Sequence, residues 1–208
     1  MNDVDNALNF VCSKLNALKI NYYIVGAVGA YLSIGLKSNR IHDDLDILIE
    51  EKDVYLLKDV FLNSDYDFYD NRYTSEKTLN ENNYTDGEHE VIAKQKNRDF
   101  HIGFFLLSKD EEQYTITEYF KANNLQKKIE RTLPIKYFTY QYSNNLIKYK
   151  KTHFKTATVE CIYKNKLSTN REKDKFDCEI FGKYIDLNKL DHLKGMSKDR
   201  LISIKTIV

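Results

Sequence analysis

Apolar residues in the first part of the chain recur with strand and helix spacing in turn. Residues 22–25 form a short β-prone run that ends at Gly26, and residues 28–34 predict a helix that ends near Gly35. Residues 45–49 are almost all apolar, which is typical of a buried strand. An amphipathic helix is predicted before them by the apolar positions Val4, Ala7, Leu8, Val11, Leu15 and Leu18.

The alternation continues after the buried strand. Residues 71–87 are polar, which predicts a loop, and residues 91–93, 100–107 and 114–120 are predicted strands. Between the strand at 45–49 and this loop, Asp53 is a candidate N-cap of a helix whose apolar face is made of Leu56, Leu57, Val60 and Phe61.

The pattern changes at about residue 122. Residues 122–143 have no clear period and contain the chain's one proline, so we place a junction there. Thr158 is a candidate cap of a helix, residues 171–184 predict another, and Ser197 predicts a short terminal helix. We therefore expect two parts: residues 1–125 with mixed helices and strands, and a basic, mostly helical region at residues 126–208.

The composition is that of a globular protein. The chain has 208 residues, of which 42% are apolar and 30% are charged. No segment has the ~18 apolar residues that span a bilayer, and the start lacks the layout of a signal peptide. We therefore expect a cytoplasmic protein with no membrane partner. Three distant cysteines, Cys12, Cys161 and Cys178, argue against a disulfide framework or a CxxC zinc site.

Charge is separated along the chain. Residues 1–120 hold 12 Lys and Arg against 22 Asp and Glu, whereas residues 121–208 hold 20 against 9. An acidic part and a basic part suit a metal-bound polyphosphate held between them. A solvated basic face, or a surface that binds RNA, explains the same charge distribution.

The segment Arg40-Ile41-His42-Asp43-Asp44-Leu45-Asp46 carries the main candidate for chemistry. Because side chains alternate along a strand, Asp44 and Asp46 point to the same face. Two carboxylates on a buried strand repel each other unless a cation lies between them, and Mg²⁺ takes oxygen ligands while leaving positions for substrate phosphates. Two aspartates spaced in this way also occur on solvated strand ends, so the neighbouring segments decide whether the pair is a functional site.

Two features supply that context. The turn Gly26-Ala27-Val28-Gly29 lies between a predicted strand and a helix, where exposed amides can hold a phosphate, although an ordinary tight turn also explains it. Asp99 opens the predicted strand 100–107, and three carboxylates around two cations match nucleotidyl or phosphoryl transfer. We interpret His101, two residues later, as a packed or solvent-facing histidine.

Taken in order, this glycine turn, Asp44-x-Asp46 and a later acid resemble the nucleotidyltransferase superfamily of the DNA polymerase β type. The form Arg40-x-His42-x-Asp44-x-Asp46 is similar to lincosamide-type antibiotic nucleotidyltransferases and to AbiEii-type toxins. The resemblance implies an α+β fold with a mixed β-sheet flanked by helices, followed by a smaller, mostly helical C-terminal part.

AbiEii-type toxins supply two further matches. They carry a basic residue beside the later acid, as in Arg98-Asp99, and lysines before an Arg-x-Lys-Asp-x-x-Asp signature. This chain has Lys164 and Lys166, followed by Arg171-Glu172-Lys173-Asp174-Lys175-Phe176-Asp177. Lys173 and Asp177 lie four residues apart on one helix face and can also pair with each other.

The resemblance implies Mg²⁺-dependent transfer of a nucleoside monophosphate from an NTP, such as ATP, to a hydroxyl acceptor, with two Mg²⁺ ions. Asp44, Asp46 and Asp99 would be the catalytic residues and the metal ligands. Asp174 would orient a lysine or the acceptor. The nucleotide would be bound by Gly26, Ala27, Arg40, Lys164, Lys166, Arg171 and Lys173.

Several alternatives stay open. A small-molecule acceptor implies an antibiotic-modifying enzyme, whereas an RNA or protein acceptor implies a toxin, whose partner would be an antitoxin. Ala27 replaces the usual second Gly or Ser of the turn, so no hydroxyl is available there to bind a phosphate. This departure motivates a second hypothesis, a non-catalytic nucleotide- or RNA-binding module on the same fold.

Overall fold

The computed structural model describes residues 3–38, 40–72, 89, 91–122, 125–142, 146–149, 152–169, 171–193 and 198–206. The predicted helices and strands of the first part are present, but Asp53 is not an N-cap. It lies inside a 3-10 helix that has Glu50 at its N-cap position, and the short α-helix that follows has no side-chain cap. Of the loop predicted at residues 71–87, positions 73–87 lie outside the described residues. The elements are α1 (Asp3–Ala17), β1 (Tyr22–Ile24), α2 (Gly26–Ser33), β2 (Asp44–Glu50), the 3-10 helix η1 (Glu51–Leu56), α3 (Leu57–Phe61), β3 (Tyr66–Asp70), β4 (Val91–Gln95), β5 (His101–Lys109) and β6 (Gln113–Ala122).

The second part contains more strand than its pattern predicts. Thr158 caps the helix that follows it, because its hydroxyl accepts a hydrogen bond from the Cys161 amide. The elements are β7 (Leu125–Pro134), α5 (Ile135–Gln141), β8 (Ile147–Tyr149), β9 (Thr152–Phe154), α6 (Val159–Thr169), α7 (Glu172–Phe181), α8 (Leu187–Leu193) and β10 (Lys198–Thr206).

The predicted terminal helix after Ser197 is wrong. Residues 198–206 form β10, which pairs antiparallel with β7 from Lys198 opposite Thr132 to Thr206 opposite Leu125. The capping signal at Ser197 reflects neighbouring residues only. Pairing with the edge of β7, which is distant in sequence, makes this segment a strand instead. Residues 122–143, which have no clear period, contain β7 and α5. Both elements depend on partners elsewhere in the chain, so no local pattern predicts them.

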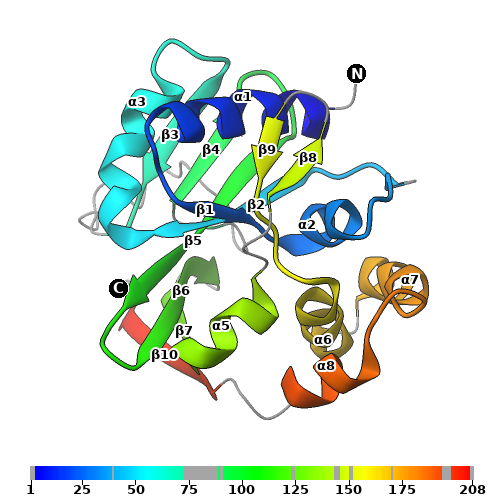
Figure 1. Ribbon diagram of the computed structural model, residues 1–208. Helices are drawn as coiled ribbons and strands as arrows, with labels where there is room; N and C mark the ends of the chain where they lie inside the picture. The colour runs from blue at the N-terminus through cyan, green and yellow to red at the C-terminus, as the bar shows by residue number, and fades with distance from the viewer. Residues whose placement is uncertain are drawn as a thin grey trace.

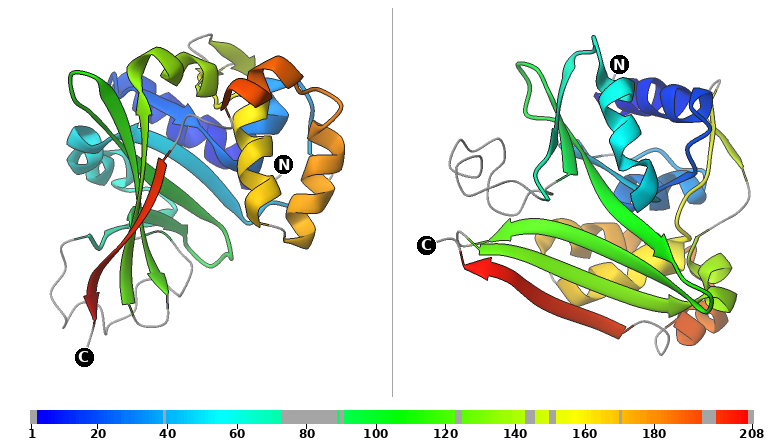
Figure 2. Two further views of the ribbon diagram at one scale, coloured as in Figure 1. Left: turned by 90° about the horizontal axis from the view of Figure 1, so that it is seen from below. Right: turned by 90° about the vertical axis from the view of Figure 1, so that its left-hand side faces the viewer.

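Within the described residues, one mixed sheet has the strand order β1-β2-β5-β6-β7-β10, and the β3–β4 hairpin attaches to β5. β2 and β5 are parallel, whereas the other pairs are antiparallel. Figure 1 shows α1 above the sheet and α5, α6, α7 and α8 below it. Figure 2 shows β6, β7 and β10 reaching beyond β2 as a layer that α6 and α7 face.

The alternation of side chains in β2 divides the interior into two cores. Leu45 and Ile47 are buried in a core that includes the apolar face of α1, whereas Leu48 is buried in a second core with residues of α2, α6 and α7. Asp44 and Asp46 have the same parity as Leu48, so they share its face. The aspartates are therefore directed toward the C-terminal helices.

The sheet continues from the first part of the chain into the second. β6 and β7 pair along their whole length, from Gln113 opposite Pro134 to Ala122 opposite Leu125. The boundary at residues 125 and 126 lies at the start of β7, and the division into two domains stays a prediction. Among the described residues, no helix has both the length and the apolar character needed to cross a membrane.

Candidate active site

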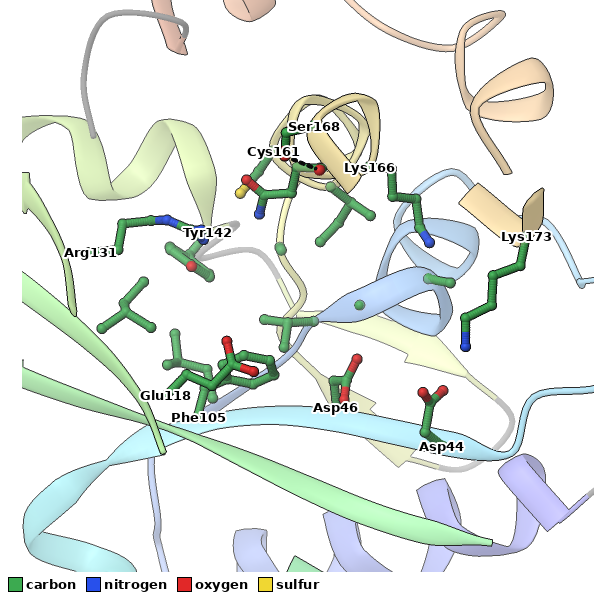
Figure 3. Close-up of a pocket in the computed structure, with 18 of the residues that line it drawn as sticks. Asp44, Asp46, Phe105, Glu118, Arg131, Tyr142, Cys161, Lys166, Ser168 and Lys173 are labelled. Atoms are coloured by element: carbon green, nitrogen blue, oxygen red, sulfur yellow. Dashed lines mark hydrogen bonds between the residues drawn. The ribbon is translucent and has the colours of Figure 1, made fainter. Parts of the chain in front are cut away.

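Asp44 and Asp46 line a cavity of about 540 Å³ between β2 and the C-terminal helices. The two carboxylates lie side by side on β2, as their spacing predicts (Figure 3). In the sheet register, Asp44 lies opposite His101 of β5, and Asp46 lies opposite Gly103. The sheet register therefore fixes both carboxylates on one face, next to a strand that runs in the same direction.

The glycine turn meets Asp46 directly. The amide of Val25 donates a hydrogen bond to the Asp46 carbonyl over 2.9 Å, which holds the turn against β2. Gly26 has φ of +62°, and a β-carbon there would collide with the Asp46 carboxylate. Gly26 and Ala27 line the cavity, and α2 begins at Gly26 with no side-chain cap. Its first amides are thus available to an anion in the cavity.

A buried ionic network joins α6, α7 and the segment before β2. Lys166 Nζ lies 2.6 Å from Asp174 Oδ1 and 2.9 Å from Asp177 Oδ2. Arg40 donates two hydrogen bonds to Asp177, and Arg171 Nε lies 2.6 Å from Asp174 Oδ2. Asp174 and Asp177 are fully buried, so these contacts compensate charges that water cannot reach. The network fixes three cations beside the two aspartates of β2.

Lys173 extends toward Asp44 from α7. Figure 3 shows its side chain pointing toward Asp44. Burial raises the pKa of Asp44, and the charge of Lys173 offsets part of that rise. Of the two roles left open for Lys173, pairing with Asp177 is not the one observed, because Asp177 binds Arg40 and Lys166 instead. Arg40, Lys166, Arg171 and Lys173 all line the cavity, as their proposed role in nucleotide binding requires.

The structure does not bring Lys164 or Asp99 to this cavity. Lys164 is two residues from Lys166 on α6, so it faces another side of the helix, next to Gln141 and Leu193. Asp99 is exposed in the turn between β4 and β5, and its neighbour Arg98 pairs with Asp3 at the start of α1. Position 99 therefore lies before the first residue of β5, and Asp99 is not among the residues that line the cavity.

Glu118 is an acid of the cavity that the sequence analysis missed. It lies on β6, lines the cavity and has a side chain that is 33% exposed. The signal in the sequence was the alternation Ile116, Glu118 within the predicted strand 114–120, which places one charge on an otherwise apolar face. Figure 3 shows Glu118 on the other side of Asp46 from Asp44.

His89 lies between Asp46 and Glu118. Its Nε2 is 3.6 Å from Asp46 Oδ1, and its Nδ1 is 3.6 Å from Glu118 Oε1. The imidazole packs edge-on against Phe105, with ring centroids 4.6 Å apart, and occupies the space beside Gly103, where a β-carbon would collide with it. No sequence pattern singled out His89, because it comes from the polar segment before β4.

The pKa values of these three acids are shifted in different directions from their usual values. Burial, followed by the charges of Asp46 and Asp43, raises the pKa of Asp44. Burial is also the largest influence on Asp46, but the hydrogen bond and charge of His89, together with the charges of His101 and Lys166, outweigh it and lower the pKa. Burial, together with the charge of Asp46, raises the pKa of Glu118. A raised pKa suits an acid that accepts a proton during a reaction.

The protein alone supplies few ligands for a metal ion. In the part of the chain that the structure describes, no group of three or more His, Cys, Asp and Glu side chains is arranged to hold one. Asp44 and Asp46 form a pair of carboxylates that opens into the cavity. Such a pair fits Mg²⁺, which commonly binds one or two carboxylates and takes its remaining ligands from substrate phosphates and water.

Comparison with solved structures places this arrangement among known folds. Neither a protein-family model nor a curated protein matches the sequence. The antibiotic-resistance factor ANT(2'')-Ia in solution superposes with a TM-score of 0.61 at 10% identity, over 94% of this chain and 91% of that one. The crystal structure of ANT(2'')-Ia in complex with adenylyl-2''-tobramycin gives 0.60 at 9% identity, over 91% of this chain and 94% of that one.

A second enzyme has the same architecture. The lincosamide antibiotic adenylyltransferase LnuA, with lincomycin bound, superposes with a TM-score of 0.53 at 14% identity, over 88% of this chain and 98% of that one. The three matches cover 88–94% of this chain and 91–98% of the other chains, so the likeness extends over nearly the whole fold. This chain therefore has the nucleotidyltransferase-type fold, as its glycine turn and Asp44-x-Asp46 predicted.

Proposed function

We propose that this protein is an Mg²⁺-dependent nucleotidyltransferase that moves a nucleoside monophosphate from an NTP to a hydroxyl group and releases pyrophosphate. The observation that carries the proposal is the position of Asp44 and Asp46, which share one cavity with Lys173 and the Gly26 turn. Acids that bind a cation and bases that bind phosphates are thereby combined in a single site of suitable size for a small ligand.

The aspartate pair is the proposed metal site. Two carboxylates on adjacent positions of one strand face repel each other, and this repulsion contributes to the raised pKa of Asp44. When bound, Mg²⁺ would neutralise the triphosphate and lower the pKa of the attacking hydroxyl. Asp99 has no role in this proposal, because it is exposed and is not among the residues that line the cavity.

The triphosphate would lie between the Gly26 turn and α7. Gly26 and Ala27 at the start of α2 line the cavity, as do Lys173 and Arg171, so backbone amides and side-chain cations are both available to the phosphates. Arg40 and Lys166 line the same end and are held in place by Asp177 and Asp174. Asp174 thus acts by orienting Lys166 and Arg171. The missing hydroxyl at Ala27 leaves backbone amides and side-chain cations to hold the phosphates.

Glu118 is the proposed general base. The acceptor oxygen attacks the α-phosphorus of the NTP and forms a new P–O bond, while the bond from this phosphorus to the bridging oxygen of the β-phosphate breaks. Pyrophosphate leaves with the electron pair of that bond, and the hydroxyl proton moves to Glu118. The raised pKa of Glu118 favours this transfer, because the carboxylate holds a proton more readily than a solvated glutamate does.

Label transfer tests this function. The full chain is incubated with each of the four NTPs labelled at the α-phosphate, with Mg²⁺ or with EDTA, and with a cell extract that supplies acceptors. Label in a new product that requires Mg²⁺ supports the proposal. Binding of NTP without label transfer or pyrophosphate release contradicts it and favours the non-catalytic nucleotide- or RNA-binding module.

The biological setting depends on the acceptor. ANT(2'')-Ia and LnuA are described as acting in antibiotic resistance and antibiotic adenylylation, which favours a small-molecule acceptor here as well. Induced expression distinguishes this setting from a toxin that would need an antitoxin. Normal growth supports a small-molecule enzyme, whereas growth arrest that Asp46→Asn abolishes supports a toxin.

A further inference from the structure

The cavity has two chemically different ends. On the side of Asp44, Lys173 and Arg171 supply positive charge. On the other side of Asp46, Figure 3 shows Phe105, Glu118, Tyr142 and Arg131. The proposed function uses the first end for the triphosphate. Pyrophosphate would leave toward the first end, and an in-line displacement brings the attacking hydroxyl from the opposite side of the α-phosphorus, which is the side of the second end.

Apolar side chains form the floor of the second end. Leu48 follows Asp46 on the same face of β2, at a distance of about 7 Å along the strand. Phe105 pairs with Leu48 in the neighbouring strand, and Ile116 of β6 continues this surface. A compound that lies on this floor would have its nearest hydroxyl close to the phosphate held at Asp46.

The side chains that form the wall of this end are held in place by packing against other residues of the protein. Tyr142 is buried, and its ring stacks on Phe138 with centroids 4.7 Å apart and meets Tyr23 edge-on at 5.5 Å. Ile162 of α6 is buried beside it. Asn165 and Ser168, which carry no charge, line the cavity from the same helix. The packed side chains of this wall are thus mainly apolar, and uncharged polar groups of α6 lie beside them.

This end of the cavity has few charged side chains, and their charges are of opposite sign. Among the described residues that line it, the charged side chains are one acid, Glu118, and one base, Arg131. Arg131 is near enough to Glu118 for its charge to act on that carboxyl. A polycationic acceptor would need several carboxylates here, and an RNA strand would need several cations along its backbone.

From this lining we infer that the acceptor is a small hydroxylated compound with an apolar face and at most one charge, bound over Leu48, Phe105 and Ile116. The inference rests on the proposed function, since it names the acceptor class of the same site. Apolar walls with a few placed polar groups are typical of sites for compact organic ligands. Glu118 would accept the proton of the reacting hydroxyl at the edge of this floor.

Fractionation of the labelled product tests the acceptor class. After reaction of the full chain with α-labelled NTP, Mg²⁺ and cell extract, the product is divided into three fractions: acid-precipitated macromolecules, small molecules that a cation exchanger still retains at a salt concentration that releases singly charged cations, and small molecules retained on a reversed-phase column. We expect the label in the reversed-phase fraction. Label in RNA, in protein or in the cation-exchange fraction overturns the inference but leaves the proposed function standing, whereas no labelled product overturns the function itself.

A variant of the floor gives an independent test on the labelled acceptor fraction. Phe105→Ala removes apolar contact and is expected to raise the KM for the acceptor about 10- to 100-fold. The KM for NTP should stay close to the wild-type value, and Phe105→Leu should restore most of the acceptor affinity. Equal effects on both KM values, or no effect on the acceptor, would overturn the assignment of this floor.

Discussion

Gly26 lies so close to Asp46 that no β-carbon fits between the turn and the carboxylate. The close approach depends on the φ of +62° at Gly26 and on the hydrogen bond from Val25 to the Asp46 backbone. Glycine is needed here for two separate reasons: its backbone conformation disfavours any other residue, and its lack of a side chain makes room for the carboxylate.

The two reasons can be separated by mutation. Gly35 also has a positive φ, of +70°, but a β-carbon there would meet no atom within 4 Å. Gly35→Ala should therefore cost about 1 kcal/mol of unfolding free energy from backbone strain alone. Gly26→Ala should cost more in urea unfolding and should also abolish nucleotidyl transfer. Equal unfolding free energies for the two variants would contradict the close approach.

Lys173 should matter for the nucleotide, whereas Lys175 should not. Lys173 lines the cavity, while Lys175 pairs with Glu172 on the exposed side of α7. Loss of a charge-assisted contact with phosphate corresponds to a fall in kcat/KM of about 10- to 100-fold for Lys173→Ala. Lys175→Ala is the matched control from the same helix. Steady-state kinetics with varied NTP checks this, and equal rates for both variants would exclude Lys173 from the site.

Glu118 should act in the chemical step. Glu118→Gln keeps the shape of the side chain but removes the proton acceptor, so kcat should fall about 10²- to 10⁴-fold. Binding of NTP, measured by fluorescence of a labelled analogue, should change little. Glu111→Gln serves as the control, because Glu111 is exposed in the turn between β5 and β6. A Glu118→Gln enzyme with wild-type kcat would remove Glu118 from the mechanism.

The ionic network around Asp177 should stabilise the C-terminal helices. Asp177 is fully buried and binds Arg40 and Lys166, so Asp177→Asn leaves two cations with reduced compensation. The free energy of unfolding at pH 7 should fall by about 3 kcal/mol. Lys175→Met, which breaks an exposed pair on the same helix, should cost less than about 1 kcal/mol. Similar costs for the two variants would contradict the role of the network.

The same network predicts a dependence of stability on pH. Burial alone would raise the pKa of Asp177, but the hydrogen bonds from Arg40 and Lys166 outweigh it and lower the pKa. The stabilisation is therefore complete above the unfolded pKa of about 3.9 and is lost as the pH falls through the lower folded value. Urea unfolding between pH 7 and pH 3 should show a steeper loss for the wild type than for Asp177→Asn, and parallel losses would contradict the lowered pKa.

Patterns within short segments of the sequence predicted those parts of the site that come from a single short segment. The positions of Asp44 and Asp46 follow from alternation within one strand, and Gly26 follows from a turn between a strand and a helix. Asp99 was expected near them because it precedes a strand that does pair with β2, but it lies in the exposed turn before that strand begins, where the alternation of the strand no longer fixes the direction of a side chain. Sequence alone does not tell which strand comes next in a sheet, so Glu118 on β6 was missed.

Other errors have the same origin. Lys164 and Lys166 were treated alike, although two residues on a helix point to different sides. The strands β7 and β10 stabilise each other across some 70 residues of chain, and no local pattern contains that pairing. The basic region is therefore partly sheet, which its helical periodicity and capping signals did not predict.

One kinetic comparison tests the central claim, that Asp44 and Asp46 act together on a metal-bound triphosphate. Three neighbouring acids of the chain are each changed to asparagine, and pyrophosphate release is measured with NTP, Mg²⁺ and acceptor extract. Asp44→Asn and Asp46→Asn should lower kcat about 10³-fold or more, whereas Asp43→Asn, at an exposed position outside the cavity, should stay close to wild type. Release by either of the first two variants at the wild-type rate would contradict the claim.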